Sequence, residues 1–266
     1  MFDLTANNFF ENKDLNQYKV SIQISLDGFS FLIISVSGNE IIAGKNSPVK
    51  ISSPGLTGHH FADWYSSEPL LKLPFQKVAV YIFEELFTLV PSETDENTVV
   101  QINHILFGQE NSRKHYFNKT RGDVKVNFAV HNELATQVEK FFSEVEWIHP
   151  VAVLLNHLPD SDKPNLALLI QAQNQYFLII RQRSKLLLAN CFTARHPNDL
   201  IYQVINTFQQ LKVTRNLTQL MISATSENNR KTAETLAPYF PNISLFPPEK
   251  EELKGINSLH YYLATL

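Results

Sequence analysis

The chain has 266 residues, of which 44% are hydrophobic and 18% are charged, and its formal net charge is −3. These values are typical of a globular protein with a sizeable core, and they exclude a largely disordered chain. The small negative charge makes nucleic acid an unexpected partner, because that ligand attracts a clustered basic face. The longest apolar runs hold about five or six residues, whereas a membrane-spanning helix needs about 20, so no contact with a membrane is expected.

The cysteine count and the first residues indicate a compartment. Cys191 is the only cysteine, so no intramolecular disulfide can form. That usage fits a reducing environment. Residues 1–17 are a polar arm that lacks the basic start and apolar core of a signal peptide. We therefore expect a cytoplasmic protein.

The ordered part of the chain is predicted to open with a meander of strands. Three strands are expected, at residues 19–25, 29–36 and 40–44. The Asp27-Gly28 dipeptide between the first two predicts a tight hairpin turn, because both central positions of a type I′ turn need positive φ. Residues 45–75 contain four prolines and are interpreted as irregular, with a short helix over 69–73.

The rest of the first half is expected to alternate strands and helices. Strands are predicted at residues 75–83, 86–90 and 123–131. One helix is predicted to begin near Ser92, and a second to cover 132–145, where apolar residues recur at helical spacing. Five basic residues between them are interpreted as part of a solvated loop: Arg113, Lys114, His115, Lys119 and Arg121. The polar stretch 159–164 carries two prolines and is the predicted linker.

The second half has a clearer order of elements. Strands are expected at residues 166–172, 176–182, 185–192, 217–223 and 242–246. Helices are expected at residues 198–211, 228–238 and 256–264. The order is therefore βββαβαβα, which predicts a mixed sheet with helices on its faces.

An internal repeat links the two halves. Residues 21–44 match residues 167–190 at an offset of 146, and the sequence FLII at 31–34 falls on FLII at 177–180. We interpret this as a duplication that gives two lobes. The predicted boundary places residues 1–160 in an N-terminal lobe with insertions and 161–266 in a C-terminal lobe.

The element order and several segments carry a resemblance. The order is similar to that of the ribonuclease H-like unit, and its duplication resembles the actin, sugar kinase and heat-shock-70 ATPase superfamily. Four segments resemble a bacterial family called domain of unknown function 3822: YKVSIQISLDGFSFLII at 18–34, FTLVPSE at 87–93, LLLANCF at 186–192 and DLIYQVINTF at 199–208. The resemblance implies an α/β protein with mixed sheets, two ribonuclease H-like lobes and an actin-like ATPase fold, without an assigned activity.

The phosphate-binding motifs of that superfamily are degenerate in this chain. Active members use an Asp to position the metal, and glycines that let backbone N–H groups approach the phosphates. The first hairpin places Ser25 at the Asp position and Asp27 at a glycine position, although a slip of one or two residues would bring Asp27 into use. The second hairpin offers Gln171 and no glycine, and no glycine occurs between Gly122 and Gly255.

In active members of that superfamily, the late strand of the second lobe is followed by a glycine pair that contacts the adenosine. Here the corresponding residues are 223–226, which read SATS. The candidate nucleotide-binding residues are therefore Asp27, Gly28, Ser223 and Thr225, and no catalytic residue and no metal ligand is assigned. Asp27 can also be interpreted as an ordinary turn residue.

Two further groups have a chemical and a structural interpretation. Cys191 could act as a nucleophile with His196, but its apolar strand favours a buried, inert thiol. His59 and His60 could bind a metal together with Asp63, but an exposed surface pair is favoured over this short spacing.

Histidines and aromatic residues elsewhere leave similar choices. His131 and His149 flank one predicted helix and are interpreted as local caps or hydrogen-bonding residues. Phe61, Trp64 and Tyr65 lie in the segment interpreted as irregular. If exposed together they would mark a partner site, and otherwise they belong to the core.

Two functions remain open at this stage. The first is a catalytically silent interaction or assembly module, without a cofactor, whose partner is an unidentified protein or a second copy of this chain. The alternative is a divergent ATPase or kinase-like protein that binds ATP and magnesium through Asp27 in the cleft between the lobes. A third hypothesis, a nucleic-acid accessory factor, is opposed by the mild acidity.

Overall fold

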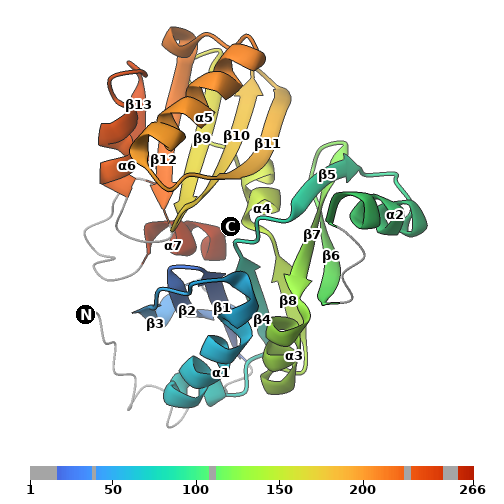
Figure 1. The fold of residues 1–266 in the computed structure, drawn as a ribbon. Coiled ribbons are helices and arrows are strands. Elements are labelled where there is room, and N and C mark those ends of the chain that lie inside the picture. The colour runs from blue at the N-terminus through green and yellow to red at the C-terminus, as the bar shows by residue number, and fades with distance from the viewer. Residues whose placement is uncertain (1–16, 38–39, 108–111, 225–228, 248–256) are drawn as a thin grey trace.

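The protein contains three β-sheets, two of which share one topology. The computed structural model describes residues 17–37, 40–107, 112–224, 229–247 and 257–266. In Figure 1 the sheet that contains β9 to β12 lies at the top, the sheet that contains β1 to β4 lies below it, and the small sheet of β5 to β7 projects to one side.

The first large sheet has the strand order β3-β2-β1-β4-β8. Its strands are β1 (Tyr18–Ser25), β2 (Gly28–Ser35), β3 (Ile41–Pro48), β4 (Lys77–Ile82) and β8 (Val145–Ile148). The helices between them are η2 (Pro54–Leu56), α1 (Thr57–Ser67), η3 (Pro69–Lys72) and α3 (Asn132–Phe141). The first three strands form an antiparallel meander, and β4 and β8 run parallel to β1. We call these elements the first unit.

The second large sheet repeats this topology as β11-β10-β9-β12-β13. Its strands are β9 (Asn165–Ala172), β10 (Gln175–Gln182), β11 (Lys185–Thr193), β12 (Thr218–Ala224) and β13 (Ile243–Leu245). Its helices are α5 (Pro197–Gln210), η4 (Arg215–Leu217) and α6 (Asn229–Leu236). We call these elements the second unit. The matching strand order confirms the predicted duplication of a ribonuclease H-like fold and the predicted order of elements.

The register of the repeat is 147 residues, not the 146 that the sequence match indicates. The two hairpins align as Tyr18–Ser25 with Asn165–Ala172 and as Gly28–Ser35 with Gln175–Gln182. The direction of the side chains also supports an offset of 147. Phe31 packs in the core under α1, and the residue in the same place under α5 is Leu178, not Phe177. The first half of β2 and of β10 is buried on both faces, so the apolar sequence does not alternate and leaves the register undetermined.

An insertion between β4 and α3 distinguishes the first unit from the second. It comprises β5 (Phe87–Pro91), α2 (Glu96–Phe107), β6 (Arg113–Lys119) and β7 (Val124–His131), with the strands in the order β5-β7-β6. The prediction of a solvated loop for the basic residues was therefore wrong for those on β6. Arg113 extends to the buried Glu84, with 3.4 Å between Nη1 and Oε1. Pairing with β7 and this buried acid explain why a polar sequence forms a strand.

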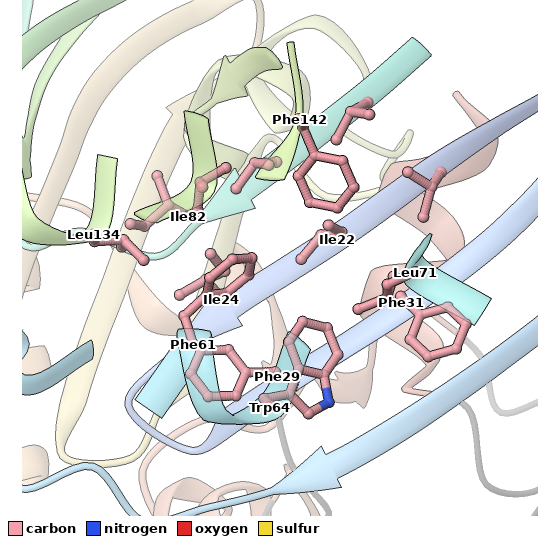
Figure 2. Packing of buried hydrophobic residues seen from close by; sticks show 14 of the residues in the cluster. Ile22, Ile24, Phe29, Phe31, Phe61, Trp64, Leu71, Ile82, Leu134 and Phe142 are labelled. Carbon is pink, nitrogen blue, oxygen red and sulfur yellow. The ribbon is translucent and has the colours of Figure 1, made fainter. Parts of the chain in front are cut away.

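Helix α1 corrects the interpretation of residues 45–75 as irregular, although the short helix over Pro69–Lys72 was predicted. Phe61 and Trp64 are 0% and 6% exposed, so they belong to the core and mark no partner site. Figure 2 shows Phe61 and Trp64 of α1 packed against Phe29 of the first sheet. The predicted helix at 132–145 ends earlier, and its last apolar residue, Val145, begins β8.

A second hydrophobic core joins the two units. Phe83 from the end of β4 meets Phe177 of β10 edge to face, with 5.7 Å between ring centroids. Two helices complete this core: α4 (Pro150–Asn156) and α7 (Ser258–Thr265). Figure 1 shows both helices between the two large sheets. Apolar packing of this kind holds the two units as one body.

Helix α7 also makes a buried polar contact with the first sheet. The His260 imidazole lies 2.9 Å from Ser21 Oγ through Nε2 and 2.7 Å from Ser30 Oγ through Nδ1. All three residues are buried. Burial lowers the pKa of His260 to about 3, so this imidazole is neutral and fastens the C-terminal helix to the first unit.

No helix in the described part of the chain is long and apolar enough to cross a membrane.

Candidate functional site

The turn of the first hairpin is formed by Leu26 and Asp27, one residue earlier than predicted. Ser25 pairs with Gly28, which begins β2 with φ of 125°. A Cβ atom on Gly28 would lie 2.4 Å from the carbonyl oxygen of Ser47. The glycine is therefore required by positive φ and by its close approach to the end of β3.

The tips of the two hairpins are in contact. Asp27 Oδ2 accepts a hydrogen bond of 2.7 Å from the backbone N–H of Gln173, at the turn between β9 and β10. Gln173 has φ of 58°, a conformation rare for residues other than glycine. We call this contact the tip bond. It joins the two positions at which the superfamily binds phosphate.

Of the other two candidate nucleotide-binding residues, only Ser223 belongs to the described part of the chain. Ser223 lies near the end of β12 and is 1% exposed, so its side chain is packed inside the second unit. Thr225 lies outside the described residues. The structure therefore brings together Asp27 and Gly28, and it adds Gln173, which the sequence analysis did not select.

A buried acid lies where the first unit meets the second. Glu84 follows β4 and is 5% exposed, and burial raises its pKa to about 7 although Arg113 opposes the shift. The neighbouring Glu85 accepts a hydrogen bond from Gln175 Nε2 at 3.0 Å. A cavity of about 20 Å³ adjoins Glu84 and Gln175, which is about the size of one water molecule and too small for a ligand.

His149 is part of the same buried junction. Its Nδ1 accepts a hydrogen bond from the N–H of Val151 in the first turn of α4, and its Nε2 lies 2.9 Å from the carbonyl oxygen of Glu84. Burial lowers the pKa of His149 to about 4. This residue caps α4 through Nδ1 and donates to Glu84 through Nε2, so both predicted roles, cap and hydrogen-bonding residue, are confirmed.

A larger pocket of about 430 Å³ opens beside the second hairpin tip. It is lined by the β9–β10 turn, by the loop that leads into α5, by α6 and by Lys50 of the first unit. The lining residues are Lys50, Gln171, Gln173, Asn174, Tyr176, Ala194, Arg195, His196, Pro197, Leu200, Lys231, Thr232 and Thr235. Among the described residues the lining includes three lysine or arginine side chains and no carboxylate, so this part of the pocket favours an anion over a divalent cation.

No pattern in the sequence indicates this pocket. Its cations come from three separated segments, at Lys50, Arg195 and Lys231, and no short motif joins them. The only available signal was the predicted topology, which places the ends of β9 and β12 and the start of α5 at one edge of the second sheet.

The remaining candidates have structural roles. Cys191 is half-buried in β11, and burial raises the pKa of its thiol to about 12, which opposes a nucleophilic role. His59 and Asp63 form an exposed pair on α1, with 3.6 Å between Nε2 and Oδ2. Within the described residues, no three side chains of His, Cys, Asp or Glu are grouped as a metal site would require.

The paired sheets and the meeting hairpin tips define a protein with an actin-like ATPase fold. The structure of a Bacteroides thetaiotaomicron protein with this fold and unknown function is similar over 94% of this chain and 96% of that chain, with a TM-score of 0.79 and 17% identity. A chain of the PilM–PilN type IV pilus biogenesis complex is similar over 93% of this chain and 97% of that one, with a TM-score of 0.57 and 11% identity.

The family is shown by the sequence itself. The model of the family described as protein of unknown function (DUF3822) matches residues 7–243. The chain therefore belongs to this family, as the four segments predicted. A comparison with curated proteins gave no match.

Proposed function

We propose that the protein is a catalytically silent member of the actin-like fold that works in the cytoplasm as a protein-interaction or assembly module. The observation that carries this proposal is the tip bond between Asp27 and Gln173. A magnesium-bound triphosphate would need the carboxylate to be free and the backbone N–H of the second tip to face the phosphates. Here these two groups bind each other, so they do not fit that cofactor.

The core between the units supports the same proposal. A nucleotide cycle in a two-lobed protein needs the lobes to move against each other. In this chain aromatic contacts cross between the units, including Phe83 with Phe177 and Phe87 with Phe177. Opening the units would expose these rings to water, so a stable frame is favoured over a hinge.

The insertion offers a surface for a partner. Four of the eleven exposed large apolar side chains of the described residues lie on it: Val100, Ile105, Leu106 and Phe117. Ile105 is 82% exposed, which is the highest value of the eleven. We place the contact with an unidentified protein, or with a second copy of this chain, on this insertion. A complex such as PilM–PilN shows that a chain of this fold can be part of a protein–protein assembly.

Two experiments test the proposal. Release of phosphate from ATP with magnesium should equal the rate without protein, and turnover that disappears in Asp27→Ala would refute the silent module. Partners retained from an extract of the species of origin, or self-association measured by sedimentation, should be lost in Ile105→Ser. They should be kept in Tyr202→Ser, which alters an exposed side chain on α5. Equal retention by both variants would remove the insertion as the contact.

The alternative function is a divergent nucleotide-binding ATPase or kinase-like protein that uses the cleft between the units. It requires the tip bond to break when the nucleotide binds. In that case magnesium should strengthen the binding of ATP, and Asp27→Ala should abolish the effect of magnesium.

A further inference from the structure

The pocket beside the second hairpin tip has a polar, packed floor. Thr232 is 4% exposed, and its hydroxyl donates to Gln171 Oε1. Gln171 in turn donates through Nε2 to the carbonyl oxygen of Gln173 at 2.9 Å. These hydrogen bonds connect α6, β9 and the hairpin turn, so the floor is held in one arrangement before any ligand arrives.

The rim of the pocket carries the positive charge. Lys50, Arg195 and Lys231 are exposed, and no ion pair with an acid is found for any of them within the described residues. Three cations without an acidic partner among the described residues, grouped around one concave surface, raise the local potential for anions. Ion pairs that stabilise the fold do not explain these three cations, because none of them contacts an acid among the described residues.

Two acids next to lining residues of the pocket accept hydrogen bonds from backbone groups. Asp27 Oδ2 accepts from Gln173 N, and Asp199 Oδ2 accepts from the N–H of His196 at 3.1 Å. Their two negative charges offset only part of the charge of the three cations. The first turn of α5, a helix of 14 residues, begins at Pro197 on the pocket wall, and its N-terminal partial charge adds to the positive potential.

Lys50 makes the pocket a joint feature of the two units. It lies between Val49 and Ile51, whose backbone N–H groups donate to the carbonyl oxygens of Asp27 and Leu26. The first hairpin tip therefore fixes the backbone on both sides of Lys50. An anion in the pocket would contact Arg195 and Lys231 from the second unit and Lys50 from the first.

We propose that this pocket binds a small phosphate-bearing molecule with at least two negative charges, and that it does so without a divalent metal. The volume of about 430 Å³ lies within the usual range for small-molecule sites. Phosphate fits the cationic rim and the hydroxyl and amide groups of the floor, because phosphate oxygens accept from both. The inference goes beyond an interaction module, since it assigns a ligand to a different part of the surface from the insertion.

No described residue of the lining is a carboxylate, which gives the proposal a distinctive consequence. Magnesium bound to a di- or triphosphate lowers the ligand's charge and has no acidic side chain of the pocket to contact. Binding should therefore be weaker with excess magnesium than with EDTA. A magnesium-dependent nucleotide site would show the opposite order.

Isothermal titration of the full chain with sodium pyrophosphate in EDTA tests the proposal. We expect a dissociation constant below about 1 mM and a loss of about tenfold in affinity, equivalent to about 1.4 kcal/mol, for each of Arg195→Gln and Lys231→Met. Lys185→Met is the matched control, because Lys185 is exposed at the opposite end of β10 and β11. It should leave the affinity unchanged.

The same titration contains the results that would overturn the proposal. The first is no binding of pyrophosphate at about 1 mM. The second is an equal loss of affinity in Lys185→Met and Lys231→Met, and the third is equal binding of sulfate from sodium sulfate at matched ionic strength. Tighter binding on adding magnesium would also overturn it. Parallel titrations with AMP and ATP in EDTA identify whether a nucleotide or a free oligophosphate is the better ligand. This titration does not measure hydrolysis, so a negative result would not bear on the proposal of a catalytically silent module. Phosphate release from ATP, in turn, would refute only that proposal.

Discussion

Replacing Asp27 with alanine should loosen the contact between the two hairpin tips. The lost bond is a hydrogen bond of 2.7 Å from a backbone N–H to a charged carboxylate, a class that contributes about 1.5–3 kcal/mol. Asp27 and Gln173 are only half-buried, so water can partly satisfy the freed N–H group. We therefore expect a loss of about 1.5 kcal/mol, at the lower end of that range.

Thermal unfolding followed by circular dichroism measures this loss. A loss of about 1.5 kcal/mol should lower the Tm by about 3–6 °C in a chain of this size. Hydrogen exchange should also quicken at the amide of Gln173, because that group loses its acceptor. Asp27→Asn should cost less than alanine, since the amide oxygen can still accept.

A surface carboxylate supplies the control for this prediction. Asp63 is 71% exposed and lies 3.6 Å from His59, so Asp63→Ala should leave the Tm nearly unchanged. If both alanine variants lowered the Tm by the same amount, or if exchange at Gln173 did not change, the tip bond would not hold the hairpins together and the reasoning on the closed phosphate site would fail.

Three further predictions follow from buried or strained groups. Gly28→Ala should lower the free energy of unfolding by about 2 kcal/mol or more in urea, because the position combines positive φ with a backbone clash. His260→Leu should cost about 2–4 kcal/mol by leaving the hydroxyls of Ser21 and Ser30 buried and unpaired, and adding Ser21→Ala and Ser30→Ala should restore part of it. Glu84→Gln should change how stability varies between pH 4.5 and 7.

The sign of the Glu84 effect follows from its pKa of about 7 in the folded protein against 4.5 in the unfolded chain. The folded state holds the proton more tightly, so the contribution of Glu84 to stability is full below pH 4.5 and is lost as the pH rises to about 7. His149 and His260, with lowered pKa values, act in the opposite direction. The measurement is therefore the difference in the free energy of unfolding between Glu84→Gln and wild type at each pH. As the pH rises, this difference should increasingly favour the variant. A constant difference would contradict the prediction.

Local sequence patterns determined most of the elements. Alternating or continuous apolar runs located the strands of both large sheets, and the spacing of Leu200, Val204 and Phe208 located α5, because these patterns reflect which side chains must leave water. They also sufficed for the order of elements along the chain, whereas the actin-like fold was implied by the resemblance. Four strands or α-helices were missed: α1, β6, β8 and α4. The helix at residues 57–67 was missed because turn-forming residues lie close to it in the sequence. The strand β6 was missed because its sequence is polar, since its partners are β7 and the buried Glu84.

Tertiary structure decided the register and the site. The FLII runs of β2 and β10 are buried on both faces and do not alternate, so the sequence cannot tell Phe177 from Leu178 as the counterpart of Phe31. Only the helix packed above each sheet settles the register. The tip bond joins residues that are far apart in the chain, and the rim of the pocket collects Lys50, Arg195 and Lys231 from three segments. Contacts of this kind depend on how two folded units meet, which no local pattern encodes.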